Sequence, residues 1–371
     1  MNPFKYGQIV TASDYCQRPK LEEKLANEIR RGQNVYLQGE RRTGKSSLIF
    51  ETLRKLKKQA VLYVDILEIK TADDFLKRVV NGLVSIKPSP GIWNRAFKAL
   101  AHLRPIASID PITGAPTLTL DSSAEFNPES IPGVLDLIAS YNKKTKPLVV
   151  VFDEFQDILK LKDASEILAQ LRSKIQFLTE IPFIFTGSIR GRMDSIFNVP
   201  ESAFFKSALP IHVGPLDNKL FHEFIAVKFN SEGRSLAPGV LDLIFEFCFE
   251  VAGDIQQFCG ALWDTTSHGD QISEKHIPLA LEQIFAHESK GYETALNIIS
   301  AQQLKFLTGL ARQGGHSPTS AKFLKASGIP QASSAQAALK RLIDLKILFY
   351  YENRYRFVNP FFRAWLLHKK L

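Results

Sequence analysis

The stretch "GERRTGKSSL", residues 39–48, constrains the fold of this chain more than any other. Two glycines stand five positions apart, and a lysine and a serine directly follow the second one. Residues 34–38 before it are rich in strand formers, and residues 46–58 carry leucines at helical spacing with lysines at the end. A strand, a glycine-rich loop and a helix in this order bind the phosphates of a nucleotide. The alternative, a solvated basic turn, does not explain the flanking strand and helix.

The spacing within this loop follows from the chemistry of phosphate binding. Gly39 and Gly44 allow the backbone to turn its N–H groups inward, and the new helix adds its N-terminal N–H groups and the positive end of its dipole. We expect Lys45 to reach the β- and γ-phosphates of ATP and the Ser46 hydroxyl to ligate Mg²⁺. Further nucleotide contacts are predicted at Arg42, Thr43 and Ser47.

A pair of acids, Asp153 and Glu154, ends the apolar strand expected over residues 148–152. Ligands of α/β proteins bind at the carboxyl ends of parallel strands, where these acids would lie. We expect Asp153 to orient Mg²⁺ and its waters, and Glu154 to polarise the water that attacks the γ-phosphate. Two acids that merely begin a helix are the alternative, which the upstream glycine loop disfavours.

A second apolar strand, within residues 181–193, also ends in polar residues. If this strand lies between the other two, a side chain at its end can touch the γ-phosphate, and we place Ser188 there. Arg190 would neutralise charge that develops during phosphoryl transfer. A solvated basic loop explains Arg190 equally well, and it is the preferred explanation for Arg192.

Composition narrows the class of protein. The chain has 371 residues, 45% of them hydrophobic and 23% charged, which is ordinary for a folded protein of two or three domains. Its three cysteines form no C-x-x-C pair, which argues against a zinc knuckle or a disulfide scaffold. There is no signal-peptide pattern and no 18-residue apolar run, so we expect a cytoplasmic protein without a membrane partner.

The pattern of elements predicts an α/β fold with three parts. Strands alternate with helices over residues 1–216, which indicates a P-loop core with a parallel sheet covered on both faces. Within it, residues 86–133 have the character of an insertion with a basic amphipathic helix over 92–103 and a β-hairpin. Residues 217–296 are helical throughout, as in a helical lid domain.

The last part, residues 297–371, shows three helices followed by a hairpin that turns at residues 352–353, the pattern of a winged helix-turn-helix. This segment holds twelve Lys and Arg but two acids, a net charge of +10, whereas the rest of the chain sums to −1. On the third helix, Lys340 and Arg341 are well placed for phosphates, and Arg354 and Arg356 lie on the wing. Double-stranded DNA is therefore a predicted partner, with packing on the ATPase core as the alternative.

Several phrases together resemble a known family. They are "NPFKYGQIV", "DYCQRPKLEEKL", "GERRTGKSS", "VVVFDEFQDI", "FIFTGSIRGRM" and "YRFVNPFFRAWL". The chain is similar over nearly its full length to the archaeal-type ATPases of the STAND class, P-loop proteins related to the AAA+ group. The resemblance implies an ASCE-type sheet, in which the Thr186 strand lies between the glycine-loop strand and the Asp153 strand. It also implies that Tyr15, Arg18 and Pro19 lie near the adenine, and that the protein is an ATP-driven switch.

One phrase departs from the family pattern. Residues 252–260, "AGDIQQFCG", carry glutamines where related proteins have an arginine, so no arginine sensor is assigned to the lid. The guanine-specific motif Asn-Lys-x-Asp does not occur, which favours ATP over GTP.

Three functional hypotheses follow. The first is a slow ATPase switch whose ATP state exposes or assembles a surface for a partner protein or a second copy of the chain. The second is a DNA-binding protein in which ATP is mainly a structural ligand. The third, a small-molecule kinase, leaves the basic C-terminal segment unexplained. The insertion helix over 92–103 is predicted to form part of a partner or oligomer surface, or else to cover its own domain.

Overall fold

The structure is a computed structural model that describes residues 1–57, 59–86, 94, 106–109, 116–119, 130–142, 147–188, 190–351 and 353–369. The Cα positions divide the chain into two compact units. Residues 8–217 form the core unit, and residues 1–7 with 218–371 form the second unit.

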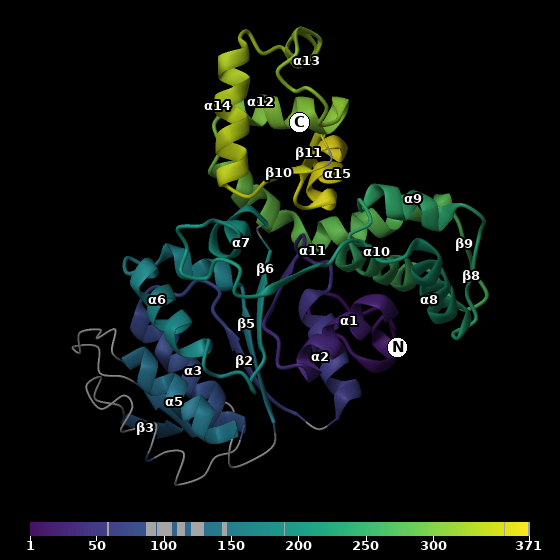
Figure 1. The fold of residues 1–371 in the computed structure, drawn as a ribbon. Helices are drawn as coiled ribbons and strands as arrows, with labels where there is room; N and C mark the ends of the chain where they lie inside the picture. The colour runs from purple at the N-terminus through teal and green to yellow at the C-terminus, as the bar shows by residue number, and fades with distance from the viewer. Residues whose placement is uncertain are drawn as a thin grey trace. The chain divides into compact units, whose positions relative to one another are not determined.

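The core unit is built on one five-stranded parallel sheet (Figure 1). The strand that carries Thr186 lies between the strand before the glycine loop and the strand that ends in Asp153, as expected. The strands, in order across the sheet, are β2 (Ala60–Asp65), β5 (Leu148–Asp153), β6 (Phe183–Gly187), β1 (Val35–Gln38) and β7 (Leu209–His212). Strands β5 and β6 are buried along their whole length, because helices cover both faces of the sheet.

Two separate sets of apolar side chains fasten the helices to the sheet. On one face, α1 (Pro19–Arg30) and α2 (Lys45–Leu56) pack on side chains of β1, β5 and β6. On the other face lie α3 (Ala72–Ile86), α5 (Ser130–Asn142), α6 (Ala164–Ile175) and α7 (Arg190–Phe197). Figure 1 shows this three-layer arrangement, which confirms the predicted α/β class. Short 3₁₀ turns, η1 (Ala12–Asp14) and η3 (Phe155–Lys160), precede α1 and follow β5.

The region of the predicted insertion contains a hairpin and an unexpected helix. Strands β3 (Ile106–Ile109) and β4 (Pro116–Thr119) pair in antiparallel fashion, which confirms the hairpin. The expected helix over 92–103 lies outside the described residues, apart from residue 94. Helix α5 begins inside the predicted insertion, and its Ile131 is fully buried against the sheet, so this stretch belongs to the core.

The second unit begins with a helical segment. Its helices are α8 (Asn218–Asn230), α9 (Val240–Phe247), α10 (Ala252–Asp264) and α11 (Ile277–Asn297), joined by β8 (Ser235–Leu236), β9 (Gln271–Ile272) and η4 (Glu274–His276). The first residues of the chain pack onto this segment. The Phe4 ring lies 4.7 Å from that of Phe229 and 6.3 Å from that of Trp263, between ring centroids.

The winged helix completes the second unit. It consists of α12 (Ala301–Gln313), α13 (Ala321–Ser327), α14 (Ala332–Asp344), the antiparallel strands β10 (Leu348–Tyr351) and β11 (Arg354–Phe357), and a last helix, α15 (Pro360–His368). Helix α15 was not expected, and it packs Phe362 and Trp365 against Tyr292 of α11. No helix in the described part of the chain is long and apolar enough to cross a membrane.

Phe152 offers a test of the core. It is fully buried, with the rings of Phe75, Phe155 and Phe185 within 6.0 Å between centroids. We expect Phe152→Ala to lower the free energy of unfolding by about 3 to 5 kcal/mol, because it removes the ring and leaves a cavity. The matched control Phe177→Ala, at a ring that is 76% exposed, should change it by about 0.5 kcal/mol or less. Equal midpoints for both variants in chemical denaturation would contradict this packing.

Candidate nucleotide-binding site

The glycine loop joins β1 to α2 and is held in a backbone shape that favours glycine at two positions. Gly44 caps α2 with a φ of 89°, in the left-handed region. A Cβ on Gly39 would come within 2.3 Å of the Val213 carbonyl oxygen, so no other residue fits there without a shift of the backbone. Arg42 also adopts a positive φ, 61°, which tightens the loop before α2. Thr43 donates its hydroxyl to the Glu40 carbonyl at 2.9 Å.

Lys45, the first residue of α2, is buried in this loop with 6% of its surface exposed. Its Nζ donates to the carbonyl oxygens of Gly39 at 3.0 Å and Glu40 at 2.8 Å. Burial lowers the pKa of Lys45, while the nearby carboxylates of Glu154 and Asp153 act in the opposite direction. The ammonium is therefore held at the centre of the loop, on the side of the predicted acid pair.

The carboxylate of Asp153 accepts four hydrogen bonds. Oδ2 accepts from the Ser46 hydroxyl at 2.8 Å and from the Tyr63 hydroxyl at 2.5 Å. Oδ1 accepts from the Thr186 hydroxyl at 2.6 Å and from the backbone N–H of Glu154 at 2.9 Å. The predicted Mg²⁺ ligands, Ser46 and Asp153, thus lie in direct contact. A hydroxyl and a carboxylate oxygen are donors that suit Mg²⁺, so the residues present fit this ion.

Glu154 stands beside this carboxylate in a strained conformation. Its φ of 54° lies in the left-handed region, which a glutamate rarely adopts. Its Oε2 accepts from the Ser188 hydroxyl at 2.8 Å and from Gln156 Nε2 at 2.5 Å. The backbone strain and the two donors together fix the carboxylate next to the loop that follows β6.

The N-terminal segment fastens to the glycine loop through backbone atoms. The Arg18 guanidinium donates to the carbonyl oxygens of Thr43 at 2.8 Å, Gly214 at 2.8 Å and Pro215 at 3.2 Å. The Ser47 hydroxyl, a predicted nucleotide contact, accepts from the backbone N–H of Val10 at 3.1 Å. Arg18 and Ser47 therefore hold the segment and the loop together in this structure.

The remaining predicted residues are placed as follows. Tyr15 is buried, and Pro19 is exposed at the first position of α1. Ser188 is 6% exposed and turned to Glu154. Arg190, the predicted catalytic arginine, begins α7 and does not lie in the solvated loop that was the alternative; its side chain lies outside the described part of the structure.

Two site residues were missed by the sequence analysis. Tyr63 lies on β2, and its bond to Asp153 depends on the parallel register that pairs Asp65 with Asp153. Burial, and then the Asp153 carboxylate, raises the pKa of the Tyr63 hydroxyl far above its usual range, so that it stays protonated and donates. Gln156 sits in η3 and is 1% exposed. Neither residue has a motif of its own, and only the strand register could have indicated Tyr63.

Comparison with known proteins supports the fold. A family model described as "Probable winged helix domain" matches residues 290–368. The chain is similar to the Walker-type ATPase PABY2304 of Pyrococcus abyssi, with a TM-score of 0.66 and 18% identity over 98% of this chain and 99% of that one. No curated protein sequence matches it.

Two further solved structures share the arrangement. The ORC1 protein of Aeropyrum pernix, solved in complex with DNA, gives a TM-score of 0.52 and 12% identity over 97% of this chain and 96% of that one. The ORC2 protein of the same organism, solved in ADPNP-ADP complexes, gives a TM-score of 0.52 and 14% identity over 96% of this chain and 95% of that one. At these identities the likeness establishes the fold alone, that of Walker-type ATPases with a C-terminal winged helix.

The contacts of Arg18 lead to a prediction about stability. We expect Arg18→Met to lower the free energy of unfolding by about 2 to 3 kcal/mol, because the carbonyls of Thr43, Gly214 and Pro215 lose a charged donor. Arg31→Met is the matched control, since the Arg31 side chain is 73% exposed and its ion pair with Glu28 is weak. Thermal unfolding of both variants would decide, and indistinguishable curves would rule out this role for Arg18.

Proposed function

We propose that this chain binds ATP with Mg²⁺ and hydrolyses it slowly, as a molecular switch of the STAND and AAA+ kind. The observation that carries the proposal is the convergence of Lys45 and Ser46, at the start of α2, on Asp153 and Glu154 at the end of β5. The likeness to an archaeal Walker-type ATPase and to ORC2 in its ADPNP-ADP complexes supports the same reading.

Each residue of the site has a role in this proposal. Lys45 and the N–H groups at the start of α2 hold the phosphates, and Ser46 with Asp153 holds Mg²⁺. The bound ion would neutralise charge on the phosphate oxygens. Glu154 would accept the proton of the attacking water, and Ser188, which donates to Glu154 in this structure, would contact the γ-phosphate. In the same proposal, Arg190 stabilises the transferring group, and Tyr15 with Pro19 lies near the adenine.

Replacing Glu154 separates hydrolysis from binding. Glu154→Gln should slow single-turnover ATP hydrolysis by about 100-fold or more with ATP affinity retained, since only the proton acceptor is lost. Lys45→Ala should abolish tight ATP binding, measured by calorimetry, because the charge between the β- and γ-phosphates is removed.

Glu166→Gln, at an exposed glutamate on α6, is the matched control and should leave both properties unchanged. If Glu154→Gln hydrolyses ATP at nearly the wild-type rate, Glu154 is not the proton acceptor and serves only as an acid before the turn η3. Unchanged ATP affinity in Lys45→Ala would remove the basis of the whole proposal.

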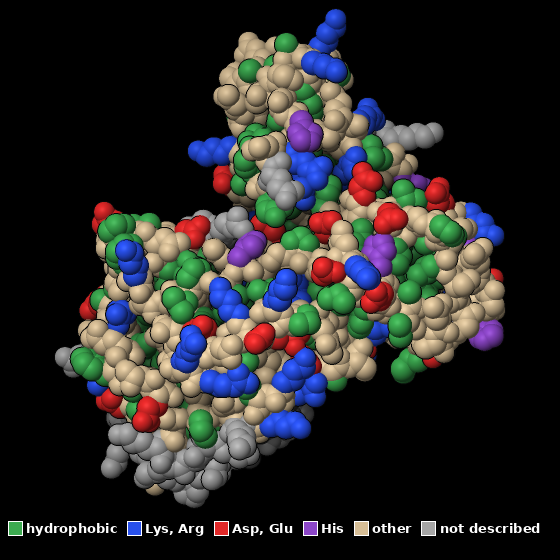
Figure 2. Space-filling view, turned by 45° about the vertical axis from the view of Figure 1, so that its right-hand side comes forward, with side chains coloured by type: hydrophobic (Ala, Val, Ile, Leu, Met, Phe, Trp, Pro, Cys, Tyr) green, Lys and Arg blue, Asp and Glu red, His purple; other side chains and the backbone are tan. Residues whose placement is uncertain are grey.

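The winged helix supports a second part of the proposal, contact with duplex DNA. Lys340 and Arg341 are exposed on α14, whereas Leu339 and Leu342 are buried under it, as the helical spacing predicts. Figure 2 shows blue side chains and few red ones on the winged helix, while both colours mix over the core unit. ORC1 of Aeropyrum pernix, of similar fold, was solved with DNA. A protein partner for the same surface is the alternative.

Arg354 and Arg356 lie on strand β11 of the wing, as the sequence predicts, but their side chains are largely enclosed. Arg356 is 6% exposed, and its guanidinium lies 5.0 Å from the ring centroids of Phe249 and Tyr351. Arg354 lies 5.5 Å from the Phe249 ring. Because Arg356 is buried and Arg354 is only half-exposed, the proposed contact with a DNA duplex rests on the exposed side chains of α14.

A salt titration tests this contact. Lys340→Gln combined with Arg341→Gln should reduce the slope of log affinity against log salt by about 1.8, because each lost phosphate contact contributes about 0.9. The control combines Lys219→Gln with Lys275→Gln, which removes two exposed charges from the helical segment. If the full chain with ATP binds no duplex at low salt, or if both double variants lose the same slope, the surface serves a protein partner.

Assembly is the remaining part of the switch proposal. An ATP-dependent switch of this class would change its association with itself or with a partner. The molar mass of the chain in solution with ATP, with ADP and with added duplex measures this change directly. If the molar mass is the same in all three conditions, the chain does not change its assembly with the nucleotide, and the switch proposal fails.

A further inference from the structure

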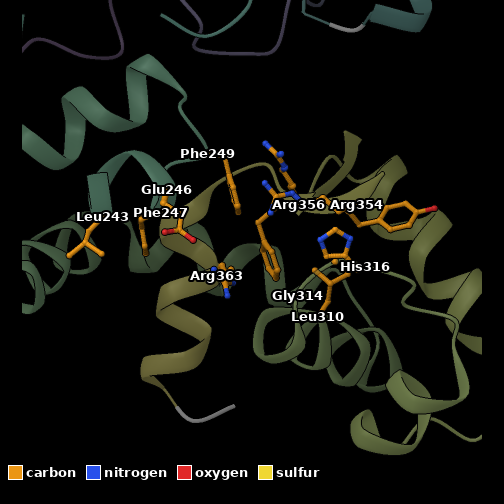
Figure 3. A pocket seen from close by; sticks show the side chains of 13 residues that line it. Leu243, Glu246, Phe247, Phe249, Leu310, Gly314, His316, Arg354, Arg356 and Arg363 are labelled. Carbon is orange, nitrogen blue, oxygen red and sulfur yellow. The ribbon is translucent and has the colours of Figure 1, made fainter. Parts of the chain in front are cut away.

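A cleft of about 400 Å³ lies inside the second unit, between the end of α9 and the winged helix (Figure 3). One wall comes from α9 and the turn after it, with Leu243, Phe247 and Phe249. The other wall comes from β11, the end of α12 and α15. Its volume is within the range of pockets that hold small molecules. Nothing in the proposed ATPase function uses it.

The cleft is strongly cationic. Arg354, Arg356 and Arg363 line it together with His316, and Glu246 is the one acid among the described lining residues. Arg363 is half-buried on α15, and its Nε donates to the Ala311 carbonyl at 3.0 Å. No carboxylate in the described part of the chain pairs with Arg363. A half-buried guanidinium without an anionic partner favours an anionic ligand.

Backbone strain places an aromatic ring at the mouth of this cationic group. Phe249 and Glu250 follow α9 with φ values of 51° and 60°, both in the left-handed region. The Glu250 N–H donates to the Phe245 carbonyl at 2.9 Å, which closes the end of α9. In helix ends of this kind the position that Phe249 occupies is usually glycine. A phenylalanine there costs about 1 kcal/mol or more. Strain of this kind persists where the presented side chain has a use.

Two glycines keep the opposite side open. A Cβ on Gly315 would come within 1.7 Å of the Tyr355 carbonyl oxygen, so the loop lies directly against β11. Gly314 lines the cleft with a φ of 82° and no side chain to fill it. Figure 3 shows Gly314 and His316 across the cleft from Phe249 and Glu246.

We propose that this cleft is a second ligand site, which binds a mononucleotide with its phosphate at Arg354 and Arg363 and its base against the apolar wall of α9. Guanidinium groups match phosphate oxygens in charge and geometry. Phe247, Phe249 and Leu243 provide the flat apolar surface that a base requires. Because the two walls belong to the helical segment and to the winged helix, a bound nucleotide joins these two parts.

Calorimetry on the full chain tests the site. AMP, adenosine or inorganic phosphate is titrated into the wild type and into Lys45→Ala, in which the P-loop no longer binds nucleotide tightly. We expect AMP to bind one site in Lys45→Ala, and adenosine and phosphate to bind it at least about tenfold more weakly. Arg354→Gln and Arg363→Gln should each weaken AMP by about tenfold or more. Lys322→Gln, which removes an exposed charge on α13 outside the cleft, is the control and should bind AMP as the wild type does.

A further variant isolates the apolar wall. Phe249→Gly removes the ring and places glycine where a positive φ is free of strain, so the fold is retained. It should weaken AMP and leave phosphate unchanged. Lys45→Ala should bind AMP as the wild type does, which separates this site from the P-loop.

Three results would overturn the inference. They are no AMP binding by the wild type, equal AMP affinity in the wild type and both arginine variants, and equal affinity for AMP and inorganic phosphate. A P-loop that binds no ATP would count against the proposed ATPase function alone, since the AMP titration of Lys45→Ala proceeds without it.

Discussion

The hydrogen bonds to the Asp153 carboxylate are the interaction on which the site of the core unit depends. Their donors come from α2, β2 and β6 as well as from the neighbouring peptide. A buried side chain with two oxygen atoms would be costly without such donors, and Asp153 is 7% exposed, so these hydrogen bonds are needed where the sheet places it. These bonds fix Ser46 and Thr186 at the same end of the sheet. Lys45 is held there as well, because it is the neighbour of Ser46 at the start of α2. The hydrogen bond from Ser46 to Asp153, at the end of β5, thus helps to hold the phosphate loop in place.

The sequence predicted the sheet well because its strands are continuous apolar runs, and β5 and β6 are buried at every position. It missed α5, since Pro132 and Gly133 argue against a helix and only packing against the sheet overrides that preference. Helix α15 did have a signal, because Asn359 caps it and Pro360 begins it, but its aromatic residues resemble the end of a strand. In the site, Lys45, Ser46 and Asp153 were recognisable by motif. Tyr63 was not, since its role arises from strand register.

In the winged helix, the net charge overstates how many basic side chains are accessible to a polyanion such as DNA. Its segment carries a net charge of +10, yet Arg356 lies between two aromatic rings and Arg363 is half-buried under the wing. These guanidinium groups hold structure together through aromatic faces and a backbone carbonyl, as arginine does more readily than lysine. The count of basic residues is a property of the sequence, whereas their availability is set by the turn after α9.

The first residues of the chain belong to the second unit, so two stretches of backbone connect the units. Asn2 donates to the Gly260 carbonyl at 3.0 Å, the Lys228 ammonium donates to the Pro3 carbonyl at 2.7 Å, and the next residue, Phe4, is 4% exposed. The backbone therefore passes between the units twice, at Gly7–Gln8 and at Asp217–Asn218. A cut of the backbone at either crossing alone would therefore leave the two units covalently joined.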